Sequence, residues 1–546
     1  MLLTRRALAA GDASATALLN CLIREICAPE HQVWADGPHL LVRLPRAGVV
    51  VRAGLARPPH GPTYRLTPPF EERRDDTWAP AGWDRLAELV AGELELATGR
   101  VNPEFLTQVR DSHAAMEAIL GARNETDTDP YVRSEQSLLA GHRFHPSPKA
   151  RQGSPDDWLP YAPEAGTRFL LHWLAVRDDL LAAEGDPGAF TALEALAPPP
   201  PPGHRVIPAH PWQLGLLADN PLLARARSEG LVRDLGQSGE AIPTSSVRTV
   251  YVPDADTFCK FSLDVRITNC VRKNAWYELT GAVVLNDLLG PVFDDLSARF
   301  DGCALLAEPA YRTVSLADRR LYEGLGVILR QGVRGLTGTP LLAAALADPD
   351  GATLGALPAL ATPDGALAWW DAYVSRVARP VLHAYLVHGV VLEPHLQNVL
   401  VTVDERGRPV QAVFRDLEGT KLTADLWRTR LKDVPPRVRE SVLYDRDRAW
   451  NRVVYCLLVN HLTEIAAAVA DLHPRLEPDL WRTARRHFTG PDRPELRALL
   501  AGVPLPAKAN LRTRWNRTAD RGATYVPAPN PLGAGLSMFK PAGSDS

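Results

Sequence analysis

Apolar residues recur at two spacings in the first part of the chain, and these spacings predict a mixed lobe of helices and strands. Residues 13–28, 82–99 and 103–122 carry Ala, Leu and Ile along one helical face. Asn102 stands before the last of these, followed by a proline, which is the pattern of a capped helix start. Residues 39–54 instead alternate like the two strands of a hairpin.

The pattern changes twice further along. From residue 204 to 315 short alternating runs predict strands, whereas after about residue 340 the spacing is mostly helical. The longest predicted helices are 366–388 and 447–472, and a strand pair at 396–404 and 409–416 separates them. We therefore expect a mixed α+β fold.

The length of the chain supports a division into lobes. With 546 residues it is too long for one hydrophobic core. The changes in pattern place a mixed N-terminal lobe at 1–140, a lobe built on an antiparallel sheet at 141–345, and a mostly helical lobe with one strand pair at 346–546.

Polar side chains gather at the ends of the predicted strand pair. Glu, His, Gln and Asn precede the apolar run in Leu392-Glu393-Pro394-His395-Leu396-Gln397-Asn398-Val399, and the second strand ends in Arg415-Asp416-Leu417-Glu418-Gly419. Amide and carboxylate oxygens on neighbouring strands suit Mg²⁺ and the phosphates that it carries. A buried polar network between strand and helix is the alternative. The pattern favours a site that handles ATP.

A second predicted hairpin carries several cations. It runs from Thr244 to Val252 and from Phe258 to Thr268, with Lys260 at the head of a polar face. Ser246 and Arg248 share a face of the first strand, and Arg272 and Lys273 follow just beyond the second. Fixed cations on a rigid sheet are suited to a polyphosphate. An ordinary face of exposed ion pairs is the competing interpretation.

A third cluster is the basic loop Gly141-His142-Arg143-Phe144-His145-Pro146-Ser147-Pro148-Lys149. Its imidazoles, guanidinium and ammonium offer several donors to a phosphate or carboxylate. A solvated loop is the plainer interpretation. Zinc is disfavoured because no further His or Cys follows at ligand spacing.

Composition narrows the class of protein. Hydrophobic residues make up 45% and charged residues 23%, and the net charge is −3, so no general basic field attracts nucleic acid or anionic membrane. No uncharged apolar stretch of about 18 residues is present, and the start does not resemble a signal peptide. The six cysteines form no C-x-x-C pair, which predicts buried thiols in a reducing cytoplasm.

Several common catalytic motifs are absent from the sequence. It contains no G-x-x-x-x-G-K-[ST] phosphate loop, no dinucleotide-binding fingerprint and no G-x-S-x-G elbow. If ATP binds, side chains on strands must hold it.

Taken together, the motifs resemble one family. They are G-H-x-x-H-P-x-x-K at 141–149, H-P-W-Q at 210–213, S-x-R-T at 246–249, K-F-S-x-x-x-R-x-T-N-x-x-R at 260–272, E-P-H-x-Q-N at 393–398 and R-D-x-E-G at 415–419. Their order, between about residues 135 and 515, is similar to that of the siderophore synthetases that work independently of nonribosomal peptide synthetases, the aerobactin-synthetase-like family. The first 130 residues carry no motif that matches.

The resemblance implies a fold and a reaction. The fold is a cupped hand, with an N-terminal thumb, β-rich fingers and a helical palm. The reaction is ATP- and Mg²⁺-dependent adenylation of a carboxylate, usually citrate or a derivative, followed by condensation with an amine, hydroxylamine or alcohol and release of AMP and pyrophosphate. Members are often homodimers, and the expected location is the cytoplasm.

The resemblance also implies roles for individual residues. Contacts to ATP fall to His142, His145, Lys149, Ser246, Arg248, Thr249, Lys260, Arg272, His395, Asn398, Asp416 and Glu418. Metal ligation falls to Asn398, Asp416 and Glu418, and the reacting groups are expected to contact Lys260, Arg272 and His395. The carboxylate or acceptor pocket is assigned Arg272, His395, Gln397 and Lys508. Arg143 departs from the family pattern, which has Pro after the first His in many members. This extra cation leaves the substrate subtype open.

Two other classes of function compete with this interpretation. His388-Gly389 before the Asn398 strand echoes small-molecule kinases of the aminoglycoside-phosphotransferase type, but Val390 stands where those kinases place the catalytic Asp. A non-catalytic sensor of citrate or nucleotide is the third possibility. Neither alternative predicts AMP as a product.

Overall fold

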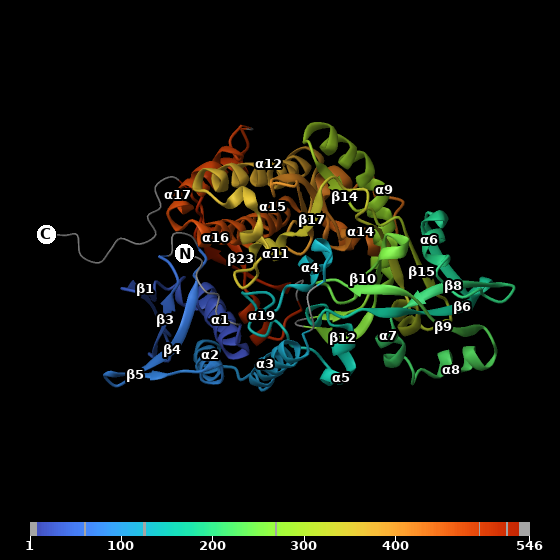
Figure 1. The fold of residues 1–546 in the computed structure, drawn as a ribbon, viewed down its shortest axis with the longest axis horizontal. Coiled ribbons are helices and arrows are strands. Elements are labelled where there is room, and N and C mark those ends of the chain that lie inside the picture. Colours follow the sequence, from blue (N-terminus) through green and yellow to red (C-terminus); the bar gives the residue numbers. More distant parts are fainter. Residues whose placement is uncertain are drawn as a thin grey trace.

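The computed structural model describes residues 8–58, 62–123, 127–267, 270–490, 492–519 and 522–533. Figure 1 shows the N-terminal elements in blue at one end, a green sheet at the other, and yellow to red helices across both. Helices and strands mix throughout, so the predicted α+β class is confirmed.

The N-terminal elements form a sheet covered by helices. The strands are β1 (Val33–Asp36), β2 (His39–Arg43), β3 (Val50–Leu55), β4 (Leu66–Arg74) and β5 (Thr77–Pro80), in antiparallel order along the chain. The helices are α1 (Ala10–Leu22), its π-helical continuation η1 (Ile23–Cys27), α2 (Trp83–Thr98) and α3 (Phe105–Ala122). Asn102 does not cap α3 directly: Glu104 is the N-cap residue, and Asn102 Oδ1 accepts its backbone N–H at 3.0 Å.

An eight-stranded sheet dominates the middle of the chain. It comprises β6 (Phe169–Arg177), β7 (Leu181–Gly185), β8 (His204–Ala209), β9 (Val232–Pro243), β10 (Thr249–Val252), β11 (Thr257–Phe261), β15 (Ala310–Val314) and β16 (Val327–Gln331). The order is β7-β15-β16-β11-β10-β9-β6-β8. Its side chains share a core with the short helices on its flank.

The predicted hairpin that carries Lys260 is present with different boundaries. Residues 244–248 form a turn, and the first strand begins only at Thr249. The second strand breaks at Ser262, whose buried hydroxyl donates to Glu323 O at 2.6 Å and accepts from Asn274 N–H at 2.8 Å. Beyond this break β12 (Leu263–Ile267) leaves the large sheet and pairs with β13 (Cys270–Arg272). Thr268, the predicted end of the strand, lies outside the described residues.

A smaller sheet joins the middle of the chain to the C-terminal helices. It contains β14 (Cys303–Leu305), β20 (Pro409–Phe414), β19 (Val399–Val403) and β17 (Thr339–Leu342), in that order. The predicted pair of strands near 396–404 and 409–416 is therefore confirmed as β19 and β20. Helix α9 (Trp276–Arg299) and helix α12 (Pro363–His388) pack beside it, and His383 and His388 of α12 both bond Asp295 of α9.

The longest apolar helix is a core element. Residues 446–472 run through α15 (Arg446–Val454), the π-helical segment η10 (Tyr455–Leu462) and α16 (Thr463–Leu472). Its most apolar 18-residue window has a mean hydropathy of 1.7, enough by composition to cross a membrane, but 94% of that window is buried inside the fold. Helix α17 (Glu477–Arg486) packs against α12 and α16.

The remaining elements are short. The helices are α4 (Pro130–Gln136), α5 (Pro155–Trp158), α6 (Thr191–Glu194), α7 (Pro211–Leu216), α8 (Pro221–Ser228), α10 (Arg319–Gly324), α11 (Ala343–Ala347), α13 (Ala424–Trp427), α14 (Pro436–Val442), α18 (Pro494–Leu500) and α19 (Asn510–Trp515). The strands are β18 (Val390–Val391), β21 (Lys421–Thr423), β22 (Leu443–Tyr444), β23 (Leu505–Lys508) and β24 (Tyr525–Ala528).

The N-terminal sheet is tied to the C-terminal helices by buried ion pairs. Arg57 follows β3 and donates to Asp471 Oδ1 at 2.9 Å and to Glu477 Oε2 at 2.6 Å. Both the Arg57 and Glu477 side chains are almost inaccessible to solvent. These two carboxylates lie more than 400 positions away along the chain, so the contact joins the two ends of the sequence.

We expect Arg57→Ala to destabilise the protein by about 3–5 kcal/mol, because it leaves the buried Glu477 carboxylate without this cation. Arg73→Ala is the matched control, since the Arg73–Asp76 pair is exposed and such pairs contribute about 0–1 kcal/mol. Thermal unfolding followed by circular dichroism measures both variants. Equal melting temperatures would contradict a stabilising role for the Arg57 contact.

Candidate functional site

The two sheets bring the candidate residues together at facing ends. Thr249 of β10 pairs with Lys260 of β11, and Lys260 also pairs with Ile328 of β16. In the smaller sheet Val399 pairs with Phe414, so Asn398 and Arg415 meet at the same end of β19 and β20. The backbone confirms this proximity, because Arg415 N–H donates to Asn398 O at 3.1 Å.

Lys260 is the centre of the cluster. Its ammonium contacts Asp416 Oδ1 at 2.6 Å and Glu418 Oε2 at 2.9 Å, and its side chain is completely buried. Burial disfavours the charge on Lys260, but the two carboxylates outweigh this effect and raise its pKa. The same ammonium, with Arg248, holds the pKa of Glu418 at about 2 against the opposing effect of burial. The ammonium and both carboxylates are therefore charged at neutral pH.

Arg248 reaches the cluster from a strained turn. Its guanidinium donates to Glu418 Oε2 at 2.7 Å and to Asn274 Oδ1 at 2.6 Å. Val247 before it has a φ of +67°, which is costly for a β-branched residue. The Ser246 and Thr249 hydroxyls bond each other at 3.1 Å across this turn. Three of the predicted residues thus lie in or beside one tightly bonded turn.

A second buried ion pair, Arg330 with Glu308, lies beside Asp416. Phe258 pairs with Arg330, so Arg330 lies on the sheet face that also carries Lys260. Arg330 donates to Glu308 Oε1 at 2.5 Å and lies 3.6 Å from Asp416 Oδ2. Asp416 itself has a φ of +73°. Val247 and Asp416 thus both have a strained backbone near Lys260. Backbone strain of this kind clusters at functional sites.

Glu135 of α4 connects the turn to the smaller sheet. It accepts from Ser245 Oγ at 2.8 Å and from Arg415 Nη1 at 2.5 Å. Arg415 also donates to Gln397 O at 2.9 Å, and Gln397 Nε2 lies 3.5 Å from Ser245 Oγ. These bonds fix the predicted Gln397 and the buried Asn398 beside the Arg248 turn.

Glu393 and His395 lie on the far side of Glu418. His395 Nε2 is 3.9 Å from Glu393 Oε2, and Glu393 pairs with Arg452 of α15. A Cβ on Gly419 would stand 1.6 Å from Glu393 Oε2, so any larger residue at the end of the R-D-x-E-G motif would displace the Glu393 side chain. Burial lowers the pKa of His395, and Glu393 partly offsets this.

The basic loop divides into two parts. The His142 side chain reaches solvent, and partial loss of hydration by its ring, followed by the nearby groups His145, Arg24, Lys508 and His395, lowers its pKa. His145 is buried, and its Nδ1 accepts from Ser147 N–H at 3.1 Å. The structure thus brings His142 near the predicted His395 and Lys508, the last residue of β23.

Lys149 is buried, and its ammonium pairs with Glu164, which also accepts from Arg151 at 2.7 Å. Its partner thus comes from the segment Pro163–Ala165, outside the basic loop. Arg272 lies at the end of β13, opposite Leu263, two residues before the Asn274 that bonds Arg248.

Several site residues were not predicted from the sequence. Glu308, Arg330 and Asn274 support the Lys260 cluster from segments without a recognisable motif. Asn460 lies in the π-helical segment of the core helix, 3.1 Å from His142 Nε2, and accepts from Leu396 N–H at 3.2 Å. The signal in the sequence that could have pointed to these residues is a polar residue within an otherwise apolar run.

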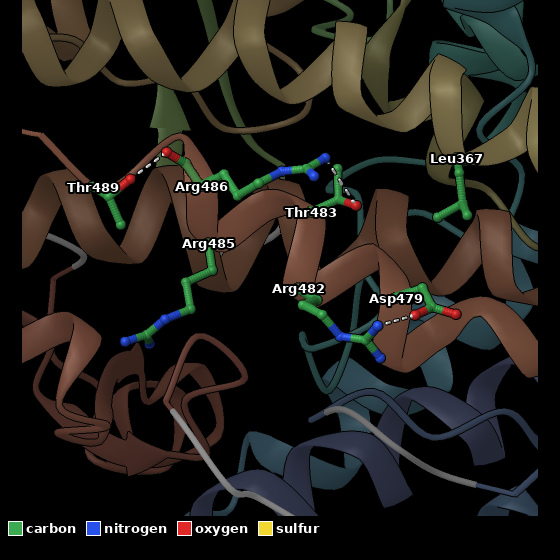
Figure 2. Close-up of a pocket in the computed structure, with 7 residues that line it drawn as sticks. All are labelled: Leu367, Asp479, Arg482, Thr483, Arg485, Arg486 and Thr489. Atoms are coloured by element: carbon green, nitrogen blue, oxygen red, sulfur yellow. Dashed lines mark hydrogen bonds and ion pairs between the residues drawn. The ribbon is translucent and has the colours of Figure 1, made fainter.

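Two other features lie apart from the cluster. Asp295, His383 and His388 are the group of potential metal ligands found among the described residues. Figure 2 shows a surface pocket of α12 and α17 lined by Leu367, Asp479, Arg482, Thr483, Arg485, Arg486 and Thr489. Arg482 is paired with Asp479, and Arg485 donates to Leu500 O. Neither feature shares a residue with the predicted site.

The cluster combines fixed cations with oxygen ligands. Three cations, Lys260, Arg248 and Arg330, face the carboxylates of Asp416, Glu418 and Glu308. The Asp416 and Glu418 side chains remain partly exposed. Such a site can bind a phosphate on its cations and a divalent cation on its oxygens.

Glu278 generates a pH-dependent stability. Burial raises its pKa to about 7, and the neighbouring Glu418 adds to the increase. The folded protein holds the proton of the Glu278 carboxyl more tightly than the unfolded chain does. The stability of the folded protein therefore falls as the pH rises from about 5 to about 7.5 and this proton is lost. We expect Glu278→Gln, which keeps an acceptor for Ala275 N–H, to lose less stability over this range than the original protein.

Melting temperatures across this pH range test the assignment, with exposed Glu405→Gln as the control. If the difference in melting temperature between the wild type and Glu278→Gln stays constant with pH, Glu278 does not titrate in this way.

Comparisons with known proteins give matches to two family models and to several relatives. The model of the IucA / IucC family matches residues 130–348, and one described as ferric iron reductase FhuF-like transporter matches residues 367–523. The chain is 30% identical to the rhizobactin siderophore biosynthesis protein RhbC of Rhizobium meliloti (strain 1021), over 94% of this chain and 96% of that protein. It is 31% identical to the L-2,3-diaminopropanoate–citrate ligase of Staphylococcus aureus (strain NCTC 8325 / PS 47), over 74% and 75%.

The fold has a solved counterpart. The structure of ATP-bound aerobactin synthetase IucA from a hypervirulent pathotype of Klebsiella pneumoniae superposes with a TM-score of 0.84 at 24% identity, covering 96% of this chain and 100% of that one. The match to RhbC extends over nearly the whole of both chains. The chain belongs to the IucA / IucC family of siderophore synthetases that work independently of nonribosomal peptide synthetases.

Proposed function

We propose that this protein activates one carboxylate of citrate, or of a citrate derivative, with ATP and then joins it to an amine, hydroxylamine or alcohol. The observation that carries the proposal is the buried Lys260 ammonium, held with Arg248 against Asp416 and Glu418 at the meeting point of two sheets. The names of relatives that ligate citrate, and the ATP-bound neighbour, support the same chemistry.

The first step joins two anions. A substrate carboxylate oxygen attacks the α-phosphorus of ATP, the bond to the β-phosphate bridging oxygen breaks, and pyrophosphate leaves with the electron pair. Lys260, Arg248 and Arg272 are proposed to stabilise the increasing negative charge, and Ser246 and Thr249 to bind phosphate or ribose oxygens. Preorganised donors of this kind accelerate a reaction without reorganising.

Asp416, Glu418 and Asn398 fit Mg²⁺ by the chemistry of their donors, since Mg²⁺ prefers carboxylate and amide oxygens. When bound there, the ion would supply charge neutralisation for the phosphates. The charge balance supports this assignment. The three cations of the cluster already face three carboxylates, so the cluster has no net positive charge left for the phosphates, and a divalent cation would supply it. In this proposal the three residues hold the ion, and it is the Asp416 and Glu418 side chains that are partly exposed to solvent.

The second step needs few groups. The acceptor nitrogen attacks the carbonyl carbon of the acyl-adenylate, the bond to the AMP oxygen breaks, and the nitrogen loses one proton. His395 and Gln397, with His142 and Lys508 nearby, are proposed to orient the carboxylate and the acceptor. Lys421 is a further candidate for contact, since its pKa is lowered by burial to about 8 and its ammonium donates to Glu418 O at 2.7 Å.

The lobes that we propose follow the expected cupped hand: a thumb at 1–140, fingers at 141–345 and a palm at 346–546. Three large hydrophobic clusters support three lobes, but they cross these boundaries: the cluster at 15–109 includes Leu511 and Trp515, and the C-terminal cluster already begins at Leu285. The large sheet would form the fingers, and the long helices the palm. We further propose a homodimer located in the cytoplasm.

The kinase alternative gains no support from the local structure. Val390, at the position where those kinases carry their base, is a buried residue in β18 and pairs with Leu422. The nucleotide product separates the two functions. Purified protein with ATP, Mg²⁺, citrate and a panel of amines should form AMP and pyrophosphate only when citrate is present. Formation of ADP would refute the ligase.

We expect Lys260→Ala and Arg272→Ala to reduce citrate-dependent pyrophosphate release by at least about a hundredfold, because each removes a cation from the developing charge. Lys273→Ala is the matched control, since Lys273 lies next to Arg272 but pairs with Glu323 at 3.2 Å. Circular dichroism checks the fold of each variant. Normal pyrophosphate release from folded Lys260→Ala and Arg272→Ala would exclude the proposed site.

We expect Asp416→Asn to lose activity mainly through weaker Mg²⁺ binding, so that the Mg²⁺ concentration for half-maximal rate rises about tenfold or more. Rates measured over a Mg²⁺ series at saturating ATP test this, with Asp404→Asn at the exposed β19–β20 turn as the control. An unchanged Mg²⁺ dependence in a folded Asp416→Asn protein would remove Asp416 from the proposed ligands.

A further inference from the structure

Three arginines between the N-terminal lobe and the C-terminal helices carry donors without partners. We name Arg24, Arg65 and Arg143 the interlobe arginine group. Arg24 is only 8% exposed and Arg65 only 6%. The buried nitrogens Arg24 Nη2, Arg65 Nη1, Arg65 Nη2 and Arg143 Nη1 have no hydrogen bond. Buried polar groups normally find a partner, so each of these donors requires an explanation.

Arg24 has the least support from its surroundings. It lies in η1, the π-helical end of the first helix, and no hydrogen bond or ion pair is recorded for it among the described residues. Its guanidinium carbon lies 3.0 Å from the centre of the Phe144 ring, in the middle of the basic loop. This stacking fixes the plane of the guanidinium, and Nη2 at its edge is left without a hydrogen bond.

Arg143 comes from the basic loop itself, at the position where many family members have proline. Its Nη2 donates to Tyr64 O at 3.3 Å, which places it against the N-terminal lobe. The departure from the family pattern thus adds a cation at the same place as Arg24 and Arg65. An anion specific to this chain's substrate would account for it.

Glu464 does not satisfy these donors. It is the carboxylate that the group shares: Glu464 Oε2 lies 3.9 Å from Arg65 Nη1, beyond hydrogen-bond distance, and Glu464 raises the pKa of Arg24 and Arg143 against the stronger effect of burial. Its other oxygen accepts from Thr63 Oγ1 at 3.0 Å. Asp471 pairs with Arg65 through Nε only. Glu464 Oε2 also lacks a hydrogen bond, so the group has four guanidinium nitrogens and one carboxylate oxygen in this condition.

The group adjoins the acceptor side of the proposed site. Arg24 and Lys508 both contribute to the electrostatic environment of His142, and Tyr455 of the π-helical segment η10 does so for Arg24. Glu25, next to Arg24, accepts from Leu511 N–H at 2.8 Å, three residues after Lys508. In contrast, none of the residues that set the pKa of Lys260 belongs to this group. The group therefore lies beyond His142, away from the proposed ATP phosphates.

We propose that Arg24 and Arg143, with Arg65 behind them, form a binding subsite for a carboxylate on the acceptor substrate. This inference rests on the proposed ligase function. A carboxylate offers two oxygens in one plane, which matches the fork of donors on a guanidinium. The preferred acceptor is then an amino acid, bound through its α-carboxylate while its side-chain amine attacks the acyl-adenylate.

The experiment compares acceptors that differ only by this carboxylate. One pair is L-2,3-diaminopropanoate with 1,2-diaminoethane, and a second is L-lysine with 1,5-diaminopentane. The reactions contain ATP, Mg²⁺ and citrate. In the pair that is used more efficiently, we expect kcat/KM for the amino acid to be at least about ten times that for the diamine. Arg24→Met and Arg143→Ala should each reduce that ratio to within about twofold, by raising KM for the amino acid and not for the diamine.

The controls separate binding from folding. Arg24→Lys keeps the charge and should keep part of the preference, and Arg482→Met, in the surface pocket of Figure 2, should keep all of it. A wild-type protein that uses diamine and amino acid equally well would overturn the subsite, as would variants that lose citrate-dependent pyrophosphate exchange before any acceptor is added. If the wild type forms no AMP with citrate at all, the proposed function fails instead.

Discussion

The site depends on one buried ammonium shared by two carboxylates. Removing a lysine from water costs several kcal/mol unless opposite charges surround it closely, and Lys260 is completely buried between Asp416 and Glu418. Those carboxylates lie in the turn that follows β20 of the smaller sheet, whereas Lys260 belongs to the larger sheet. The pair therefore fixes the two sheets relative to each other, and the strained backbone at Val247 and Asp416 is held in place because that arrangement satisfies every charge of the cluster.

The local parts of this site could be predicted from the sequence, because antiparallel pairing brings adjacent motifs together. The contact between the end of β19 and the end of β20 follows from a short hairpin, as does the pairing of Thr249 with Lys260. The burial of Lys149 against Glu164 could not be predicted, because a basic loop looks the same whether its charges are free or paired. Nor could the break at Ser262, which depends on bonds to Glu323 and Asn274.

Contacts between distant segments were beyond the sequence for a different reason. Arg57 meets carboxylates more than 400 positions away, and Leu511 and Trp515 of α19 belong to the core of the N-terminal lobe. In Figure 1 the red α19 accordingly lies among the blue helices. A division by sequence pattern assigns the first 140 residues to a separate lobe, although α19, the last α-helix among the described residues, completes its core. The N-terminal lobe lacks a motif, yet it supplies Arg24 and Arg65 to the neighbourhood of the site.

Charge balance connects these observations to the order of events during catalysis. Around Lys260 the cations and carboxylates are equal in number, so a nucleotide cannot bind there simply by adding its phosphates. It must either bring positive charge with it or draw Lys260 and Arg248 away from Glu418. Within the interlobe arginine group, four guanidinium nitrogens lack a hydrogen bond, whereas Glu464 contributes one oxygen that lacks one, so this group has donors to spare. The first region therefore suits a phosphate group accompanied by a metal ion, and the second suits a bare carboxylate. Two anionic substrates can thus occupy neighbouring regions without competing for the same cations.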